Sequence, residues 1–315
     1  MKKPLFFLLL FCVPGAGLFA QGTAVGSSSH NSQPANDQNR IKVRVELVNV
    51  LTTVTDKKNR LVTDLTKDDF RIFEDGRPQE IRFFSRETDL PLRIGILIDT
   101  SNSIRERLSF EQEAAIDFLN IAVRPGKDRA FVVAFDVEPQ LLRDYTDDIE
   151  TLSTAIRGLK AGGVTSLYDA AFFSCKEKLL FFPPPEPYLR RVMIILSDGQ
   201  DNQSVHTLEE ALSMAQRAEV TIYTVSTNWS GAEGRGDNVL RRLAKETGGR
   251  AFLPFAAGDL EADFQEIARE LRSQYSLAYV STNTAHDGTF RNITIQPVDK
   301  NLRVRAKNGY FALSR

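Results

Sequence analysis

The side chains best suited to chemistry follow a short apolar run in the first third of the chain. Residues 94–98 are apolar apart from one glycine, and Asp99, Ser101 and Ser103 come next at alternate positions. One carboxylate and two hydroxyls offer the oxygen ligands that hard cations such as Mg²⁺ prefer. The same residues are also typical of a helix cap, because Ser and Asp accept hydrogen bonds from the first N–H groups of a helix. Alone, this segment indicates a metal site only weakly.

Two further segments strengthen the metal-site interpretation. Residues 192–196 are a second apolar run, and it leads into Asp198. Between the two runs lies a glycine-containing loop, residues 162–170, in which Thr165 and Ser166 precede a predicted helix. Ligands of open parallel sheets bind at the carboxyl ends of the strands. We therefore expect these segments to meet at one edge of a sheet.

Strand and helix patterns alternate through the middle of the chain. Largely apolar runs, typical of strands covered on both faces, occur at residues 94–98, 130–135, 192–196 and 220–225. Between and after them, apolar side chains three or four positions apart predict helices. One such stripe is Phe110, Ala114, Phe118 and Ile121, and another is Leu260, Phe264, Ile267 and Leu271. Thr207 and Glu210 have the spacing of a capping box at the start of a further helix. The alternation predicts an α/β fold, a doubly wound and mainly parallel sheet with helices on both faces.

The two flanks of this region read as β structure. Residues 41–47 alternate apolar and charged side chains, the pattern of a half-buried strand. Residues 70–73 and 81–84 flank Asp75-Gly76, which predicts a hairpin with glycine where φ is positive. Near the other end, residues 275–280, 290–298 and 302–306 predict strands. Because so few strands are not stable alone, we expect both flanks to form one small β-sandwich-like unit around the α/β domain.

The first residues have the layout of a secretory signal peptide. Two lysines precede an apolar run at residues 5–13, and small residues lead to Ala20. The run is shorter than the roughly 20 residues that span a bilayer. We therefore expect an exported protein, periplasmic, secreted or at the cell surface, with no membrane-spanning segment after cleavage. Cys12 leaves with the leader, so Cys175 cannot form an internal disulfide and is expected to be buried.

Composition excludes some partners. The chain of 315 residues has 40 basic and 41 acidic side chains, a formal net charge of −1. The chain has no excess of basic side chains, so its composition gives no indication of nucleic-acid binding. Residues 21–40, rich in Gly, Ser, Asn and Gln, cannot bury enough apolar surface to offset the entropy of ordering, and they are expected to form a disordered linker.

The three polar segments together resemble the metal-ion-dependent adhesion site (MIDAS) of von Willebrand factor A (VWA) domains, familiar from integrins. The flanks also resemble exported "VWFA-related" proteins of Acidobacteria, at Val54-Thr55-Asp56, Asp69-Phe70, Glu74-Asp75-Gly76, Gln274-Tyr275 and Lys307-Asn308-Gly309-Tyr310. After the leader (1–20) and the linker (21–40) inferred above, the resemblance implies three parts: an N-terminal β unit (41–89), a VWA domain (90–271) and a C-terminal β segment (272–315) that packs with 41–89.

The resemblance also implies a ligand set. Ser101 and Ser103 would bind Mg²⁺, or Mn²⁺ or Ca²⁺, directly, Thr165 would supply a third hydroxyl, and Asp99 and Asp198 would act mostly through water. One position would remain for a carboxylate from a protein partner. The family usually places Thr straight after two glycines, whereas Val164 intervenes here. Ser166 therefore stays an alternative to Thr165.

Two other functions compete with metal-dependent adhesion. A metal-dependent hydrolase would also need a base or nucleophile, but His30, His206 and His286 lie in no catalytic motif, and His206 is expected to face solvent. A structural role in the cell envelope with a metal-free site is the other alternative. The complete ligand set favours a non-enzymatic, metal-dependent binding module. Specificity would lie in loops such as residues 229–237, where Trp229 either contacts a partner or packs on a helix.

Overall fold

A computed structural model describes the backbone of residues 47–87, 89–180, 189–228, 230, 232–254 and 257–314. The expected leader and linker, and Trp229, lie outside these ranges. Within the ranges, no helix is both long enough and apolar enough to cross a membrane.

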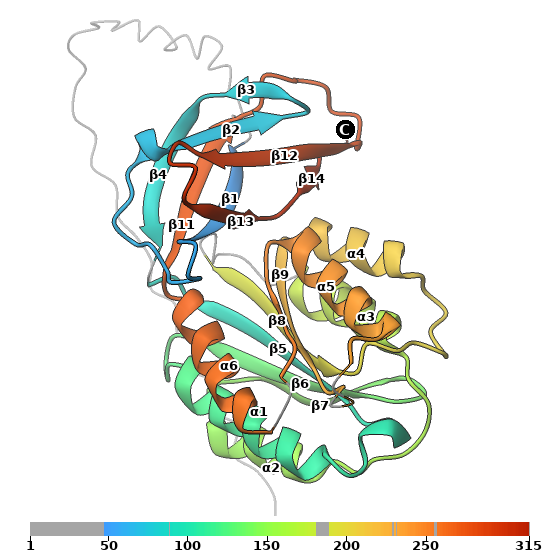
Figure 1. The fold of residues 1–315 in the computed structure, drawn as a ribbon. Coiled ribbons are helices and arrows are strands. Elements are labelled where there is room, and N and C mark those ends of the chain that lie inside the picture. Colours follow the sequence, from blue (N-terminus) through green and yellow to red (C-terminus); the bar gives the residue numbers. More distant parts are fainter. Residues whose placement is uncertain are drawn as a thin grey trace, which may run out of the picture. The chain divides into compact units, whose positions relative to one another are not determined.

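A six-stranded sheet forms the centre of the α/β domain (Figure 1). Its order is β10-β9-β8-β5-β6-β7, and neighbouring strands are parallel except β6 and β7, which are antiparallel. Every residue of β5 is buried, as expected for a strand covered on both faces. The strands are β5 (Leu92–Asp99), β6 (Arg129–Phe135), β7 (Pro139–Thr146), β8 (Arg190–Ser197), β9 (Val220–Ser226) and β10 (Ala251–Phe252).

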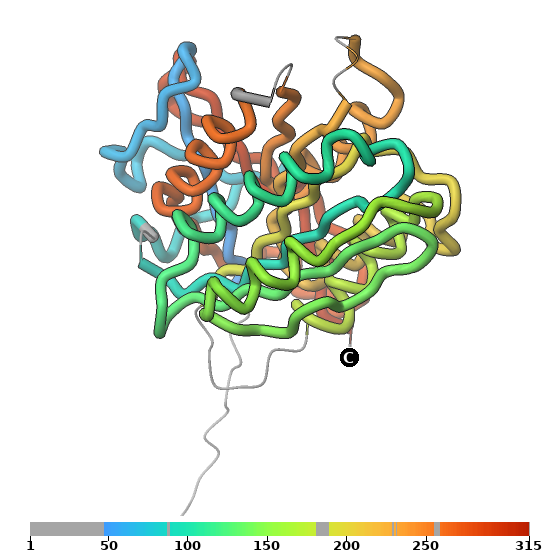
Figure 2. Tube along the Cα trace, turned by 90° about the horizontal axis from the view of Figure 1, so that it is seen from below, coloured from blue at the N-terminus to red at the C-terminus, as the bar shows by residue number. Residues whose placement is uncertain are grey.

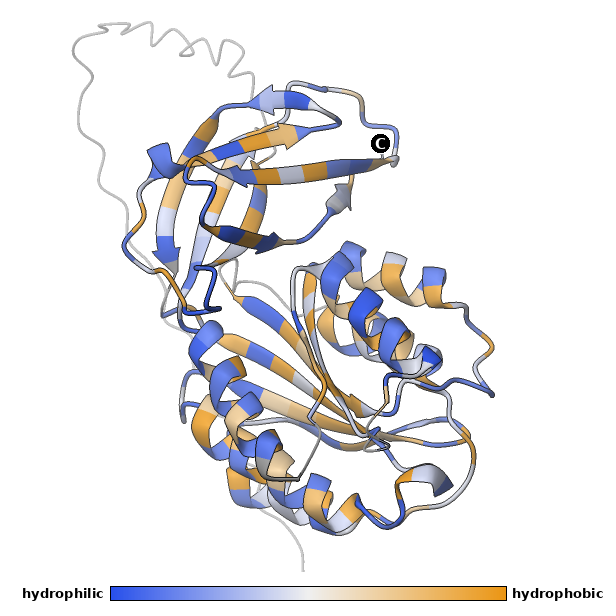
Figure 3. Cartoon of the chain, viewed as in Figure 1, coloured by the Kyte–Doolittle hydropathy of each residue, from blue (hydrophilic) through white to orange (hydrophobic). Residues whose placement is uncertain are grey.

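Helices cover both faces of this sheet, and alternate strand residues point to each layer. Ile94 and Ile96 of β5 belong to a core with α1 (Leu108–Ala122), α2 (Ile149–Arg157) and α6 (Ala257–Glu270). Leu97 of β5 belongs to a second core with α3 (Leu167–Phe173), α4 (Leu208–Arg217) and α5 (Arg235–Thr247). Figure 3 shows apolar residues along the strands of this sheet and helices that carry both apolar and polar residues. The predicted doubly wound α/β fold is confirmed.

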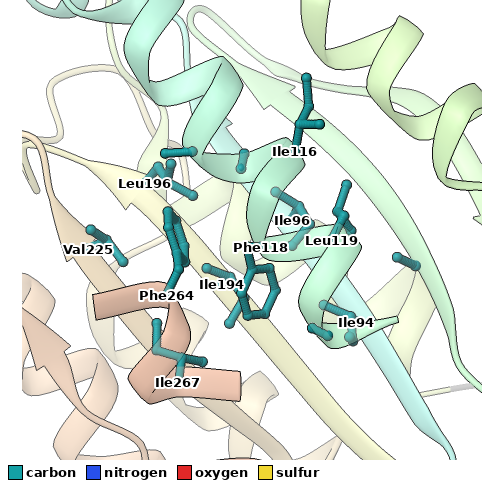
Figure 4. Close-up of a cluster of buried hydrophobic side chains, with 14 of the residues drawn as sticks. Ile94, Ile96, Ile116, Phe118, Leu119, Ile194, Leu196, Val225, Phe264 and Ile267 are labelled. Atoms are coloured by element: carbon teal, nitrogen blue, oxygen red, sulfur yellow. The ribbon is translucent and has the colours of Figure 1, made fainter. Parts of the chain in front are cut away.

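Helix α1 lies beside α6, as Figures 1 and 2 both show. The rings of Phe118 and Phe264 are 5.2 Å apart between centroids and close the core between the two helices (Figure 4). The expected stripe of α1 is wrong at one end, because Ile121 is 49% exposed. The buried face is rotated round the helix and runs through Ala115, Phe118 and Ala122.

Strands from both flanks of the α/β domain form two four-stranded sheets, which we call the β unit. Their orders are β13-β1-β11-β4 and β14-β12-β2-β3. Side chains from both sheets, among them Val50, Ile72 and Leu277, share one core. The strands are β1 (Leu47–Thr55), β2 (Phe70–Glu74), β3 (Arg77–Gln79), β4 (Ile81–Glu87), β11 (Gln274–Val280), β12 (Phe290–Pro297), β13 (Arg303–Ala306) and β14 (Gly309–Phe311). The expected sandwich-like unit from the two flanks is therefore present.

The predicted hairpin has a different second strand. Asp75 and Gly76 form the turn with φ of 47° and 78°, but β2 pairs with β3 rather than with residues 81–84. Strand β3 is a short edge strand that holds Pro78, and an edge tolerates the missing N–H of proline. Strand β4 crosses to the other sheet, where it pairs with β11.

Two local predictions are confirmed. Thr207 begins α4 with a reciprocal capping box: the Glu210 N–H donates to the Thr207 hydroxyl at 3.2 Å, and the Thr207 N–H donates to the Glu210 carboxylate at 2.8 Å. Cys175 is fully buried in the π-helical turn Ser174–Leu179. Burial raises the pKa of its thiol far above the usual range, so the thiol is unreactive at neutral pH.

Candidate metal centre

Asp99 is the last residue of β5, and its carboxylate is fully buried between two strand ends. One oxygen, Oδ1, accepts the N–H of Ser101 at 2.9 Å. The other, Oδ2, accepts the hydroxyl of Ser197, the last residue of β8, at 2.7 Å. Because parallel neighbours end at the same edge of a sheet, the sequence places an acid and a hydroxyl donor side by side there.

The charge of Asp99 is poorly compensated. The pKa of its carboxyl is raised to about 6, mainly by burial. Hydrogen bonds from Ser197 and Ser101 lower this pKa, whereas the nearby charge of Asp198 raises it. Asp198 is half-buried, and its Oδ1 accepts the Gln200 N–H at 3.0 Å. Two carboxylates that repel each other at a buried edge are an environment that a cation would stabilise.

Ser101 and Ser103 place their hydroxyls together. Their Oγ atoms are 2.9 Å apart, because the short 3-10 turn Asn102–Ile104 brings alternate residues to one side. Ser101 is buried and Ser103 is exposed. The pair therefore reaches from the buried Asp99 to solvent, as a site open to a ligand requires.

Hydrogen bonds tie the 162–170 loop to the Ser101 segment. The Gly162 N–H donates to the Thr100 carbonyl at 2.7 Å, and both the N–H and the side-chain amide of Asn102 donate to the Gly163 carbonyl, at 3.3 and 3.2 Å. Gly163 has a φ of 80°, which favours glycine. The first two predicted segments are thus in contact.

A second set of hydrogen bonds ties the 162–170 loop to the segment after β8. The Thr165 N–H donates to the Asn202 side chain at 3.0 Å, and the Thr165 carbonyl accepts the Asn202 N–H at 3.1 Å. Gly199 has a φ of 76°, and a Cβ there would lie 2.2 Å from the Gly236 carbonyl oxygen. The structure therefore brings all three predicted segments to one edge of the sheet.

The third hydroxyl has two candidates. Thr165 is 4% exposed and Ser166 is fully buried. The Ser166 Oγ has no hydrogen-bond partner among the residues that the structure describes, and Ser166 directly precedes α3. A buried hydroxyl without a partner costs free energy, so both positions remain plausible oxygen donors.

The donor set fits a hard cation. It holds two carboxylates, Asp99 and Asp198, and otherwise hydroxyls, while the described residues contain no cluster of three or more His, Cys, Asp or Glu that could hold a metal. Oxygen donors of low total charge suit Mg²⁺ and related ions. They do not form the nitrogen and sulfur cage of a structural zinc site.

The side chain of His206 is 36% exposed, so the expected solvent-facing position holds in part, but the ring also makes contacts that the sequence did not predict. Its Nδ1 lies 2.6 Å from Asp169 Oδ1, and its ring stacks on Phe172 with centroids 3.8 Å apart. Asp169 also accepts the N–H groups of Val205 and His206, each at 2.9 Å. The histidine thus anchors the loop after Asp198 onto α3. The position of His206 just before the N-cap of α4 did not predict its contacts with Asp169 and Phe172.

Sequence reasoning missed two polar residues of this region. Ser197 orients Asp99, and its place at the end of an apolar strand could have revealed it. Glu111, on α1, is fully buried and interacts electrostatically with Asp99 and Asp198. Its position among helical residues gave no sequence signal of this kind.

The fold and this edge together define a class, doubly wound α/β domains that carry a polar site at the carboxyl ends of their strands. Residues 94–200 match the family model of the von Willebrand factor type A domain. The human von Willebrand factor A domain-containing protein 3B is 28% identical over 163 residues, which are 50% of this chain and 11% of the human protein. The match identifies a von Willebrand factor type A domain over residues 94–200 of this chain.

Solved structures resemble parts of the chain at low sequence identity. Proximal thread matrix protein 1 from the mussel byssus, in a form with a zinc-occupied MIDAS motif, is 18% identical with a TM-score of 0.50, covering 63% of this chain and 50% of that chain. A von Willebrand factor type A protein from Catenulispora acidiphila is 12% identical with a TM-score of 0.49, covering 87% of this chain and 75% of that chain. The resemblance of the flanks to Acidobacteria proteins stays a prediction.

Proposed function

We propose that this chain is an exported protein-binding module that engages an acidic group of its partner through one divalent cation. Asp99, Ser101, Ser103, Thr165 and Asp198 would hold the cation. The observation that carries the proposal is the hydroxyl pair of Ser101 and Ser103, with oxygens 2.9 Å apart, beside a buried carboxylate whose charge is poorly compensated.

The charge of the donor set favours an anionic ligand. Asp99 and Asp198 together neutralise a dipositive ion, and the three hydroxyls add no charge. Mg²⁺ commonly keeps several waters and takes few protein carboxylates. A carboxylate from a partner can replace one of these waters, and its attraction to the ion strengthens as water leaves the contact.

Exposed apolar side chains lie on the loops that carry the site. Val164, next to Thr165, is 38% exposed, and Val205, in the loop anchored by Asp169, is 88% exposed. Apolar side chains on loops at a strand-end site are typical of a surface that becomes covered on binding. They support a protein partner rather than a small solute.

The cation is Mg²⁺ in this proposal, with Mn²⁺ or Ca²⁺ as substitutes that also take oxygen ligands. The mussel protein of the same fold has zinc in its MIDAS motif, so Zn²⁺ belongs in the same test. Export to the periplasm, the cell surface or the medium rests on the signal-peptide pattern of the first 20 residues. Catalysis is not proposed, because His206 is engaged with Asp169 and Phe172.

Isothermal titration calorimetry tests the site on the chain without its leader. One Mg²⁺ is expected per chain, with Asp99→Asn lowering the affinity at least a hundredfold because a charge next to the ion is removed. Asp117→Asn, an exposed acid on α1, is the matched control and should bind like the wild type. Equal affinity in Asp99→Asn and wild type would overturn the ligand assignment, and no binding of any of the four cations by the wild type would overturn the function.

Partner binding is tested next, by affinity capture from the native cell envelope in Mg²⁺ and in EDTA. A partner retained only with Mg²⁺, and lost with Asp99→Asn bait, supports metal-bridged binding. A partner retained equally in EDTA contradicts it.

A further inference from the structure

Glu111 is an unusual residue for the middle of a packed helix face. It lies on the buried side of α1 and is fully shielded from solvent. Neither of its carboxylate oxygens has a hydrogen-bond partner among the residues that the structure describes. Acidic side chains are almost never fully buried unless they are paired, so both oxygens of this carboxylate can still accept hydrogen bonds.

The charges around Glu111 point to the metal centre. Asp99 and Asp198 both repel it, and Arg107, one helical turn earlier, attracts it. The Arg107 guanidinium also donates a hydrogen bond to the carbonyl of Thr227, just after β9. Together with burial, the two aspartates raise the pKa of Glu111 to about 8. Three carboxylates therefore lie within electrostatic reach of one another.

The position of α1 explains this arrangement. The helix begins only a few residues after Ser103, and it packs over β5, which ends in Asp99. Its first turns therefore lie behind the metal-binding edge. Glu111 belongs to the first turn of α1 and is buried, whereas Ser103 is exposed.

We propose that Glu111 is a third acidic group of the metal centre, a positioning residue that accepts hydrogen bonds from water molecules bound to the ion. This inference rests on the proposed function. Direct coordination is not part of it, because the described residues contain no group of three acids close enough to hold one metal. Acceptors behind a metal's immediate ligands orient those ligands and raise its affinity.

A purely structural role makes a different prediction. If Glu111 were a neutral core residue with no part in the site, a neutral side chain of the same shape would change neither stability nor metal binding. If it were a structural charge, its removal would lower stability. In the proposal, Glu111→Gln leaves the metal-free protein as stable as the wild type or more so, because burial keeps Glu111 mostly protonated at neutral pH when no ion is bound, but weakens metal binding.

The experiment measures both quantities. Calorimetry with Mg²⁺ is expected to show at least a tenfold loss of affinity in Glu111→Gln, while thermal melting in EDTA shows a Tm equal to or above that of the wild type. Glu113→Gln is the matched control, on the same helix, with a side chain that is 61% exposed and 3.5 Å from Arg157. It should retain wild-type affinity.

The outcomes separate the two proposals. Wild-type Mg²⁺ affinity in a folded Glu111→Gln overturns the role of Glu111 and leaves the proposed function intact. Absence of Mg²⁺ binding in the wild type overturns both. If Glu111→Gln does not fold, Glu111→Asp replaces it, because it keeps the charge but withdraws the carboxylate by one methylene. It should then bind Mg²⁺ several-fold more weakly than the wild type, and unchanged affinity would equally overturn the inference.

Discussion

Glu74 in the β unit and Glu111 in the α/β domain are both buried acids, 2% and 0% exposed, but their surroundings differ. The Glu74 carboxylate accepts hydroxyl hydrogen bonds from Tyr279 at 2.8 Å, Tyr310 at 3.0 Å and Ser281 at 2.5 Å. Arg291, itself buried, lies 3.7 Å away. Among the described residues, Glu111 accepts no hydrogen bond, and Asp99 and Asp198 repel it more than Arg107 attracts it.

We interpret the Glu74 carboxylate as part of the structure of the β unit and the Glu111 carboxylate as part of a ligand site. In the β unit, hydroxyls and a guanidinium offset the cost of burying a carboxylate. At the strand-end edge of the α/β domain, burial and the charges of Asp99 and Asp198 raise the pKa of Glu111 in spite of the attraction by Arg107. In the proposed function, a positive ion from solution offsets the remaining cost of this burial.

The largest expected effect is on stability in the β unit. Glu74→Ala should lower the free energy of unfolding by about 3–5 kcal/mol, because it leaves the Arg291 charge buried without its partner. Urea denaturation measures this loss. The Mg²⁺ affinity should stay at the wild-type value, and a fall in affinity would show that the two regions are energetically coupled.

The next effect is a pH dependence of the metal-free protein. The folded pKa values of Asp99 and Glu111 are raised from 3.8 to about 6 and from 4.5 to about 8. Between the ordinary and the raised values the folded chain binds more protons than the unfolded chain, so stability should fall as pH rises from about 4 to 8. Each unit of raised pKa corresponds to about 1.4 kcal/mol.

Thermal melts in EDTA and in Mg²⁺ measure this dependence. Mg²⁺ should restore stability most at the upper end of the range, where the carboxylates are ionised. Glu111→Gln should flatten the decline above about pH 6 in EDTA. A Tm that stays constant or rises from pH 5 to 8 in EDTA would contradict the contrast between the two regions.

The smallest effect distinguishes the two candidate hydroxyls. Thr165→Ala should weaken Mg²⁺ binding about tenfold, because it removes a proposed ligand but no charge. Ser166→Ala should change the affinity less than threefold. Calorimetry on both variants decides between them, and a larger loss in Ser166→Ala would reassign the third hydroxyl.

Most of the fold could be predicted, because burial on both faces leaves an unambiguous apolar run. Strands β5, β6, β8 and β9 follow such runs closely. The hairpin partner of β2 could not be predicted, since the step of β4 into the other sheet depends on how two sheets pack. Edge strand β7, which is partly exposed, lacks the apolar run that marked the others.

The residues of the proposed metal site could be predicted in part, because several of them directly follow predicted strands. Residues on strand ends inherit their position from the strands, so Asp99, Ser101 and Asp198 could be placed together from sequence. Glu111 could not, because hydrophobic periodicity considers apolar side chains only. Its own carboxylate and the neighbouring Gln112 occupy the buried face of α1 and shifted the expected stripe toward Ile121.

The register between β4 and β11 has a consequence for protein engineering. Glu87, the last residue of β4, pairs with Gln274, the first residue of β11. The chain therefore leaves the β unit and returns to it at adjacent points of one antiparallel pair, and everything between is inserted at what would otherwise be a hairpin turn. Domains whose two ends lie side by side can be grafted into other proteins at surface turns. The α/β domain, with its proposed metal-binding edge, could therefore be transferred as one insert through two neighbouring peptide connections.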